Sequence, residues 1–594
     1  MRQITGYIKT KLTTDNAILL AVMSCIASML WFATQPVERA WCHTDITLTY
    51  AIPVLTLIGV VLIQIKNKRI TLSLLDVVLI TWFLYVMGRA YFGASYPCAT
   101  FCLRTIQMMM LYVALRLLFT SLPLREEYIV LALILYGLWE AWLGFGQFIH
   151  GNSRHYLYFL TGSFLNPGPY SAILAMGLVM ALMSRKKSMK GKFYYSFFTL
   201  SLFTFIILLP ATWSRAALLA TAICVGIIYW NEWKRWFWWV AGLGIAVGFV
   251  LYYIKAGSAD GRSIIYLISI LSITHHPILG SGISSFFHQY AEEMARFSQG
   301  HPDFNFQSAD VLDFAFNDLL RIGVEQGLVG IGFAIAVIIL VFRSLRNTGR
   351  ILRMGLLALL VFSLFSYPFE LLPYQIITVL ILAYAGTPES ANIPVGWKRQ
   401  LLYRYALPFC CLLFIAPLAV FVLHKIDKRA KAELDYRMMA GITDVAFIDD
   451  YYELLPLLTE NPRFLFDFGK MLAQQRRYND SNAMLRQGAL VSNDPMFYVI
   501  QGNNYRDMGA YTEAETAYRK AYHVLPNRLY PLYQLMCLYE QSGETQKMRE
   551  MAQQVIDFNV KVESPATKEM KDTALELIKK EKQREIPMPF NKHF

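Results

Sequence analysis

The chain has 594 residues, of which 56% are hydrophobic and only 16% are charged, whereas an average soluble domain has about 25% charged residues. This composition excludes a string of soluble domains, an intrinsically disordered protein, a collagen-like protein and a small disulfide scaffold. The formal net charge is +13, which in a soluble protein would indicate a nucleic-acid partner. Where the basic residues lie therefore decides what this charge means.

Apolar stretches of membrane-crossing length, about 20 residues each, recur through the first 425 residues. The first of them lacks a small-residue cleavage site of the A-x-A kind, so we interpret it as a retained anchor and not as a signal peptide. We expect thirteen spans, near residues 17–34, 48–65, 72–92, 101–119, 127–149, 165–184, 193–212, 215–230, 237–254, 321–342, 355–369, 374–388 and 401–424.

Basic residues concentrate in the loops on one side of these spans if consecutive spans alternate in direction. The positive-inside rule makes that side cytoplasmic, together with the N-terminus. The long loop 255–320 and the C-terminal tail then lie outside, and the charge indicates topology, with no nucleic-acid partner. The cations concerned are Lys66, Lys68, Arg69, Arg185, Lys186, Lys187, Lys190, Lys192, Lys234, Arg235, Arg343, Arg346, Arg350, Arg353, Lys398 and Arg399, with Arg2, Lys9 and Lys11 at the start.

Three of the eight cysteines, Cys42, Cys98 and Cys102, lie in or beside the expected outer loops. An oxidising outer compartment would allow Cys42 to pair with Cys98 or with Cys102. The sequence contains no C-x-x-C pair and no Cys/His spacing typical of a zinc site, so we expect no structural zinc.

After Ile426 the sequence becomes charged and polar with helical periodicity, and two segments align at a spacing of 33 residues. We therefore predict an all-α protein with a membrane domain over 1–426 and a tetratricopeptide-like α-solenoid over 427–594. Such a solenoid either binds a protein partner through its concave face or acts as a passive cap. The second repeat carries Tyr498, Gly502, Tyr505, Gly509, Tyr511, Ala514, Tyr518, Ala521 and Pro526, and a weaker third repeat carries Leu532, Tyr539 and Gly543.

Three polar features stand where the expected spans meet the outer side. Asn166, in the segment TGSFLNPGPYS, either lines a cavity or caps a helix that begins at Pro167. Arg215 opens a span, where it either reaches lipid headgroups or faces a polar cavity as a fixed cation for phosphate. Arg262 is a second arginine in the outer loop, and the glycines that follow in HHPILGSGISSF predict a tight turn.

A group of acceptors follows at Asp310, Asp313 and Asn317, spaced i, i+3 and i+7. If this stretch is helical, the three side chains share one face. Asp313 is then a candidate general base toward a hydroxyl. The alternative is a solvated face at a helix start, where acidic residues suit the helix dipole.

The order and spacing of these motifs resemble the O-antigen ligase superfamily, which also contains O-antigen polymerases and O-linked oligosaccharyltransferases. The resemblance covers about residues 150–345 by motif, and the arrangement of spans extends it to about 425. Its residues are Gly162, Phe164, Asn166 and Pro167, then Ser214 and Arg215, Arg262, then Pro277, Gly280, Gly282 and Phe286, and finally Asn317, Glu325, Gly327 and Gly330.

The resemblance implies a glycosyltransferase of the bacterial inner membrane that moves a glycan from a polyprenyl-diphosphate carrier to a hydroxyl on the periplasmic side. Arg215 and Arg262, with Asn166, would hold the diphosphate and stabilise its leaving charge, so neither a metal nor another cofactor is expected. The acceptor would be lipid A-core in a ligase, another glycan in a polymerase, or a protein Ser or Thr in an oligosaccharyltransferase. The periplasmic repeat domain favours a protein acceptor or protein partner by analogy of fold.

One position departs from the family pattern, because ligases and O-linked transferases usually have a histidine before the asparagine, proposed as the base. Phe316 occupies that place here, so either another group takes the proton, with Asp313, Asp310 or His301 as candidates, or this protein works differently. Two rival classes remain. A transporter of lipid-linked glycan would use charges inside spans, such as Asp76, Glu140 and Glu370, whereas a membrane-anchored scaffold would tolerate loss of the outer arginines.

Overall fold

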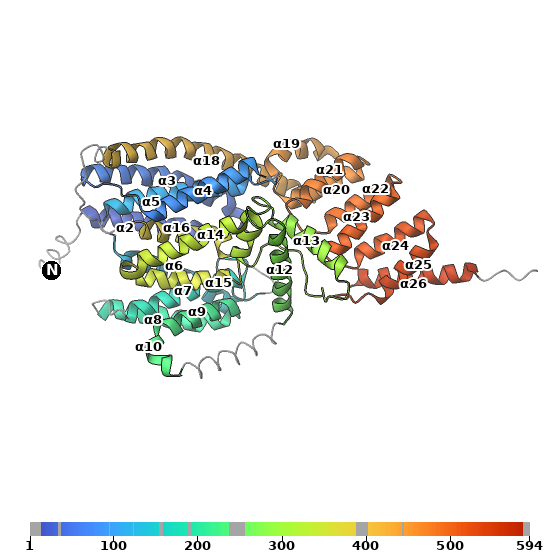
Figure 1. The fold of residues 1–594 in the computed structure, drawn as a ribbon, viewed down its shortest axis with the longest axis horizontal. Coiled ribbons are helices and arrows are strands. Elements are labelled where there is room, and N and C mark those ends of the chain that lie inside the picture. The colour runs from blue at the N-terminus through green and yellow to red at the C-terminus, as the bar shows by residue number, and fades with distance from the viewer. Residues whose placement is uncertain are drawn as a thin grey trace, which may run out of the picture. The chain divides into compact units, whose positions relative to one another are not determined.

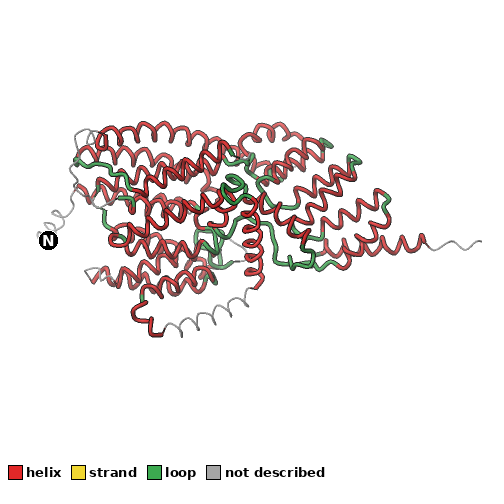
Figure 2. The backbone as a smooth tube through the Cα atoms, in the orientation of Figure 1, coloured by secondary structure: helices red, strands yellow, loops and turns green. Residues whose placement is uncertain are grey.

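The computed structural model describes residues 14–33, 37–93, 96–122, 124–153, 158–186, 192–236, 256–387, 402–441 and 445–585. This part of the chain is helical, with no β-strand (Figure 2). It divides into two compact units, which are described separately. The first unit comprises Met1–Phe92, Ala99–Ile254 and Ala315–Lys431, and the second comprises Gly93–Cys98, Lys255–Phe314 and Ala432–Phe594.

The first unit is a bundle of long apolar helices (Figure 1). Large apolar side chains cover its outer surface, as in Ile65, Leu200 and Phe414, which are 72%, 68% and 75% exposed. Its elements are α2 (Thr14–Ala33), α3 (Val37–Ile65), α4 (Leu74–Phe92), α5 (Ala99–Ser121), α6 (Glu126–His150), α7 (Pro167–Lys186), α8 (Lys192–Ala211), α9 (Arg215–Ile228), α10 (Trp230–Trp233), η1 (Lys234–Trp236), α14 (Asp318–Thr348), α15 (Arg350–Ser363), η2 (Pro368–Glu370), α16 (Leu372–Ala385), η3 (Leu402–Ala406) and α18 (Leu407–Met439).

Eight helices in the described residues are long and apolar enough to cross a membrane, so the predicted multi-pass bundle is confirmed. Three further apolar helices, Ala21–Trp31, Arg215–Ile228 and Leu372–Ala385, are shorter. The span expected at 355–369 corresponds to the 14-residue α15, and the one expected at 237–254 lies outside the described residues. The eight are Asp45–Ile65, Leu74–Phe92, Ala99–Ser121, Glu126–His150, Pro167–Lys186, Tyr194–Ala211, Asp318–Thr348 and Leu402–Met439.

Contacts between helix ends bring several basic loops to one end of the bundle, called the basic end below. Lys66, just after α3, donates to the carbonyl of Ser121 at the end of α5, at 3.3 Å. Glu126, at the start of α6, accepts from the backbone N–H of Leu352 in the first turn of α15, at 3.1 Å. These loops therefore lie together, as alternating spans require, while their assignment to the cytoplasm stays a prediction.

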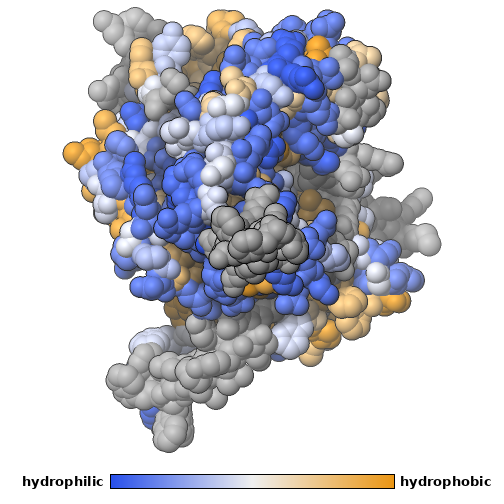
Figure 3. Space-filling model, turned by 90° about the vertical axis from the view of Figure 1, so that its right-hand side faces the viewer, coloured by the Kyte–Doolittle hydropathy of each residue, from blue (hydrophilic) through white to orange (hydrophobic). Residues whose placement is uncertain are grey.

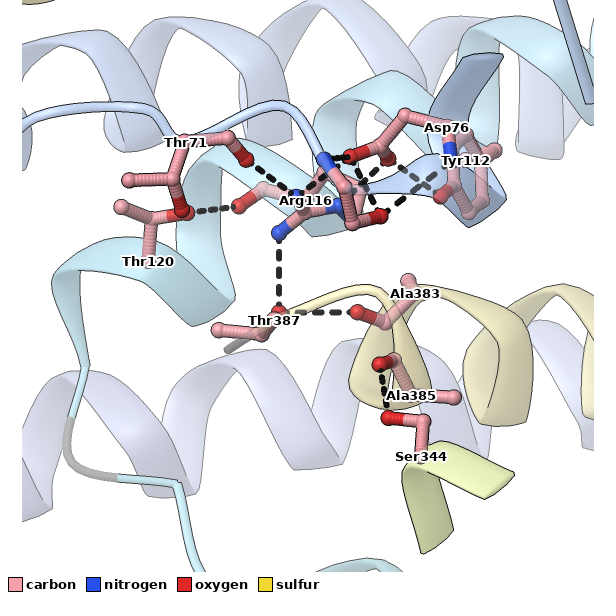
Figure 4. A network of polar contacts seen from close by, with 10 residues as sticks. Thr71, Asp76, Tyr112, Arg116, Thr120, Ser344, Ala383, Ala385 and Thr387 are labelled. Atoms are coloured by element: carbon pink, nitrogen blue, oxygen red, sulfur yellow. Dashed lines mark hydrogen bonds and ion pairs between the residues drawn. The ribbon is translucent and has the colours of Figure 1, made fainter. Parts of the chain in front are cut away.

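A buried ion pair closes the basic end by joining α4 and α5 (Figure 4). Asp76 and Arg116 have side chains only 5% and 6% exposed, and Arg116 Nε and Nη2 each donate to the carboxylate at 2.9 Å. Tyr112 donates to the same carboxylate at 2.5 Å, and Arg116 Nη1 reaches Thr387 Oγ1 beyond α16 at 3.0 Å. Asp76, one of the charges that a transporter would use, is therefore engaged in a bond between helices.

The second unit combines two helices of the long loop with a series of helix pairs from the C-terminal region (Figure 1). Three hairpins stack in order, α20/α21, α22/α23 and α24/α25, and α26 packs on the last of them. The surface turned to the viewer in Figure 3 is largely hydrophilic. The elements are α12 (Ala256–His275), α13 (Phe286–Gly300), η4 (Val445–Phe447), α19 (Ile448–Leu458), α20 (Pro462–Gln474), α21 (Tyr478–Ala489), α22 (Met496–Asp507), α23 (Tyr511–Val524), α24 (Tyr530–Ser542), α25 (Thr545–Asp557) and α26 (Pro565–Glu585).

Glycines stand where the helices of a hairpin cross most closely. A Cβ atom on Gly502 would lie 2.6 Å from the ring atom Cδ1 of Tyr518, and one on Gly469 would lie 2.8 Å from Leu485. Since interiors are close-packed, a side chain at either position would push the two helices apart. The unit thus has the stacked pairs that the repeat predicts. Its assignment to the tetratricopeptide class and the domain boundary at 426 stay predictions, and α18 continues through that boundary without interruption.

Candidate functional site

The segment before α7 is held as a fixed turn by two polar side chains of α6. Gln147 Oε1 accepts from the backbone N–H groups of Thr161 and Gly162, at 2.9 and 2.8 Å. Glu140 accepts from the backbone and the hydroxyl of Ser163, at 3.0 and 2.6 Å. Glu140, the second intramembrane acid considered for a transporter, therefore shapes this turn.

Gly162 is required at the centre of that turn. Its φ of +56° lies in the left-handed region, which costs little only for glycine. A Cβ atom there would lie 2.7 Å from Glu140 Oε2 and would also overlap the ring of Tyr170. The first glycine of the motif is thus explained by backbone geometry and packing.

Asn166 is the N-cap of α7, as one of its two predicted roles requires. Its Oδ1 accepts from the backbone N–H of Gly168 at 2.8 Å, and Pro167 is the first helical residue. This is the usual arrangement of a capping Asn followed by Pro. The cap occupies the side-chain oxygen, so the amide Nδ2 is the atom that could donate to a phosphate.

Arg215 is the first residue of α9, half-buried, and follows Trp213, whose φ is +52°. The helices α7 and α9 run parallel, because Lys186 at the end of α7 donates to the carbonyl of Ile228 at the end of α9, at 2.8 Å. Their N-termini therefore share the opposite end of the bundle. Helix N-termini carry partial positive charge and exposed N–H donors, which favour anions.

Asn317 caps α14 at this same end. Its Oδ1 accepts from the backbone N–H of Leu320 at 3.0 Å, and its Nδ2 donates to the carbonyl of Leu364, just after α15, at 3.1 Å. The segment after α15 also reaches α7, since a Cβ on Gly168 would lie 3.8 Å from Ser366 Oγ. The N-termini of α7, α9 and α14 therefore all lie at this end of the bundle, which we call the converging end.

Phe316, which replaces the expected histidine, has a distinct structural role. Its φ is +53°, a conformation that bulky residues rarely adopt and that marks a constrained backbone. Its ring packs edge-on against Tyr367, with the centroids 5.4 Å apart. The side chain thus fixes the entry into α14.

One site residue escaped the sequence reasoning. Arg321 donates to Glu325 at 3.0 Å and forms an ion pair with Glu370. Glu370 is the last of the three acids, after Asp76 and Glu140, that a transporter would use. Glu325 is only 2% exposed. The i, i+4 spacing of Arg321 and Glu325 is a signal that could have revealed this pair. Two carboxylates therefore neutralise Arg321.

The last two glycines of the motif lie where α14 is broken. Gly327 has φ +66° and ψ −162°, which interrupts the helical hydrogen bonds. The carbonyl of Gln326 accepts instead from the Tyr85 hydroxyl, and its Oε1 accepts from Trp82 Nε1, both at 2.9 Å. A break inside a membrane helix is tolerated when neighbouring groups satisfy the freed backbone in this way.

Arg262 lies on α12 of the second unit and is half-buried. The chain passes close beside it, because a Cβ on the preceding Gly261 would lie 2.9 Å from the carbonyl oxygen of Ser308. The predicted tight turn between α12 and α13 is confirmed, since Gly280 and Gly282 both have positive φ, +69° and +119°.

The expectation that Asp310, Asp313 and Asn317 share a helical face is wrong. Residues 301–317 are irregular and α14 begins only at Asp318, because Asn317 terminates the loop as an N-cap. Asp310 forms ion pairs with Arg528 at 3.3 Å and Lys561 at 3.2 Å. The exposed Asp313 has neither a hydrogen bond nor an ion pair within the described residues.

His301 ends α13 and is exposed. Its Nδ1 lies 3.0 Å from the carbonyl of Phe297, and its ring stacks on that of Phe297 at 4.3 Å. Asn166, Arg215 and Asn317 therefore belong to the first unit, at one end of its bundle, whereas Arg262, His301 and Asp313 belong to the second. Cys42 lies in α3, but its side chain is outside the described part, so its pairing stays a prediction. No group of His, Cys, Asp or Glu in that part could hold a metal ion.

Residues 200–335 match the family model described as O-antigen ligase, a stretch that runs from within α8 to the first half of α14. It includes Arg215, Arg262, His301, Asp313 and Asn317, and begins after Asn166. No protein of curated function matches the chain. The match indicates a membrane glycosyltransferase of the O-antigen ligase type, which in general uses a lipid-linked glycan donor and an acceptor.

Proposed function

We propose that this protein moves a glycan from a polyprenyl-diphosphate carrier to an acceptor hydroxyl on the periplasmic side of the bacterial inner membrane, as a protein O-oligosaccharyltransferase or an O-antigen ligase. The observation that carries the proposal is the position of Arg215. It lies within residues 200–335, which match the O-antigen ligase model, and in the first turn of α9, at the same end of the bundle as the N-termini of α7 and α14.

The charge distribution supports the orientation. The converging end is opposite to the basic end, where Lys66 and Lys186 lie. If the basic end faces the cytoplasm, the converging end faces the periplasm. Arg215 is then a cation on the side that the positive-inside rule leaves poor in cations, which favours a functional reason for its presence.

The proposed reaction uses cations to stabilise the leaving group. The acceptor oxygen bonds to the anomeric carbon, the bond from that carbon to the phosphate oxygen breaks, and polyprenyl diphosphate leaves with one additional negative charge. Arg215 and Arg262 stabilise that charge through bidentate hydrogen bonds, and the Nδ2 of Asn166 is a further donor. Asn317 supports this end by capping α14.

A base must take the proton of the acceptor hydroxyl, and Asp313 is our choice. Asp310 is already bound to Arg528 and Lys561, and His301 stacks on Phe297. Asp313 is exposed and has no such contacts in the described structure. The C-terminal hairpins favour a protein acceptor, because such solenoids bind polypeptide.

The test compares two arginines at opposite ends of the bundle. Arg215→Ala should lower glycan transfer on the order of 10²–10³-fold, the usual cost of removing one group that stabilises transition-state charge, with lipid-linked donor and protein level unchanged. Arg262→Ala should act similarly. Arg185→Ala is the matched control and should retain activity. Arg185 is an exposed cation at the end of α7 that donates to the hydroxyl of Tyr195. Full transfer by both Arg215→Ala and Arg262→Ala would contradict the proposal.

Deletion of the gene distinguishes the acceptors. Loss of protein glycosylation with intact surface polysaccharide indicates the oligosaccharyltransferase, and loss of long-chain lipopolysaccharide indicates the ligase. Surface chains reduced to a single repeat would instead indicate a polymerase and contradict both.

A further inference from the structure

Two adjoining cavities lie in the second unit, beside the C-terminal hairpins; residues 298–307 of the long loop line one of them. We call this part of the long loop, residues 298–310, the ligase-like loop. The first, called the junction pocket, has a volume of about 250 Å³ and lies between residues 298–307 and the end of α23. The second, called the hairpin groove, has a volume of about 580 Å³ and is bordered by α23, α24 and α25. Tyr522 and Phe558 line both of them, so the two lie side by side.

Hydrogen bonds between distant parts of the chain hold the walls of the junction pocket in place. Ser298 Oγ donates to the carbonyl of His523 at 2.8 Å. Gln307 Nε2 donates to the carbonyl of Asn559, also at 2.8 Å. The pocket is therefore formed before any ligand arrives, as is usual for small-molecule sites.

The lining of the junction pocket combines aromatic rings with uncharged polar groups. Four aromatic rings, those of Phe304, Phe306, Tyr522 and Phe558, face five amide side chains, and neither a carboxylate nor a Lys or Arg lines it among the described residues. His523 also lines it, and burial together with Arg519 and Lys520 lowers the pKa of its imidazole. The imidazole is therefore uncharged at neutral pH.

Asn527 supplies a buried acceptor to this pocket. Its residue is 6% exposed, and its Nδ2 donates to the carbonyls of Phe306, Gln307 and Ala309, at 3.2, 3.2 and 2.7 Å. These bonds fix the amide, so Oδ1 faces away from them. That oxygen is buried and meets no donor in the described structure. A buried acceptor without a donor is unfavourable, and a ligand hydroxyl that reached this oxygen would satisfy it.

We propose that the junction pocket and the hairpin groove bind a neutral sugar ring of the glycan that this protein transfers or extends. A pyranose ring has faces of C–H groups, which pack on aromatic rings, and a rim of hydroxyls, which pair with amide side chains. The identification of the ligand as a glycan rests on the proposed function. The groove adds Glu550 and Asp557, which accept from hydroxyls and repel phosphate, so the site takes the sugar and not the diphosphate.

The experiment measures sugar binding by saturation-transfer NMR, with the full-length protein in a detergent that carries no sugar headgroup. The probes are N-acetylglucosamine and methyl galactoside, with glucuronate as the charged comparison. We expect transfer to the ring protons of a neutral sugar and weaker transfer to glucuronate. Phe558→Ala should reduce the neutral-sugar signal at least about tenfold. Gln554→Ala, at an exposed position in the groove, should weaken it without affecting folding.

Met508→Ala is the matched control, because Met508 is 45% exposed on the same hairpins and does not line either cavity. It should bind sugar like the unchanged protein. A neutral-sugar signal that is absent, or equal in all variants, would overturn the proposal, as would displacement of the signal by an unglycosylated acceptor peptide. The assay contains no donor and involves no transfer. Arg215→Ala should therefore still bind sugar, and the proposed function can fail without this result failing.

Discussion

Polar contacts join distant parts of the chain both at the basic end of the first unit and in the second unit, where residues 298–310 meet the C-terminal hairpins. We call the second region the junction. The two sets of contacts differ in their exposure to solvent. At the basic end one ion pair, Asp76–Arg116, is nearly excluded from solvent. At the junction the charges stay in water. Asp310, Arg528 and Lys561 have side chains that are 55%, 55% and 42% exposed.

This difference determines how each region responds to damage. Removal of one partner of a buried pair leaves a charge without compensation, which is strongly destabilising. An exposed pair contributes only about 0–1 kcal/mol and is screened by salt. Loss of one partner is therefore costly at the Asp76–Arg116 pair, whereas each exposed pair that holds residues 298–310 on the C-terminal hairpins contributes little. We infer that this loop can loosen without unfolding the protein.

The largest expected effect comes from Asp76→Ala. It leaves Arg116 buried and unpaired, which should lower the free energy of unfolding by about 3–5 kcal/mol. Denaturant titration of the helical signal in detergent measures this. The matched change at the junction, Asp310→Ala, should cost less than about 1 kcal/mol.

A double replacement separates charge from packing in that cluster. Asp76→Leu combined with Arg116→Met removes both charges and should recover much of the lost stability, because apolar residues of similar volume often replace a buried pair without loss. Equal stability of Asp76→Ala and the unchanged protein would remove the distinction between the two regions.

The buried pair also shows what the sequence could not reveal. Asp76 is conspicuous as an acid within an apolar stretch, but its partner is 40 residues away on the next helix. The local sequence pattern does not predict which residues of two helices pack together. The same holds for Glu140 and Ser163. Arg321 and Glu325 are different, because their i, i+4 spacing on one helix predicts an ion pair.

Features that depend on the local backbone could be predicted. The cap at Asn166, the turn at Gly280 and Gly282, and the close crossing at Gly502 follow from residue types that few other conformations favour. The reading in which Asp310, Asp313 and Asn317 share a helical face requires this stretch to be helical, and it is irregular up to Asn317. Its preference for the N-cap position was the signal that the helix begins after it.

An intermediate effect is expected for Asn527→Ala at the junction. The change removes the donor to three backbone carbonyls of the ligase-like loop, so it should cost about 1–3 kcal/mol in local stability. Hydrogen exchange of residues 301–309 should accelerate about 10–100-fold, while α4 and α5 keep their protection.

Asn559→Ala is the control for that experiment. Asn559 contacts Gln307 through its backbone carbonyl, so loss of its side chain leaves the contact in place. If exchange in 301–309 is unchanged by Asn527→Ala, this loop is held by something other than the amide.

The smallest expected effect is a pH dependence of the junction, set by His523. Burial, Arg519 and Lys520 lower the pKa of this imidazole below its usual value of 6.5. Above pH 6.5 the imidazole is neutral whether the loop is docked or released, so pH has no effect through this group. Between 6.5 and the lower docked pKa, the released state binds more protons, and docking weakens as the pH falls.

Hydrogen exchange of residues 298–309 at pH 7.5 and 5.5, corrected for the intrinsic effect of pH, measures this change. His523→Asn removes only the imidazole, so the part of the pH dependence that disappears in this variant belongs to His523. An unchanged pH profile in this variant would show that the half-buried His523 does not set the pH dependence of this contact.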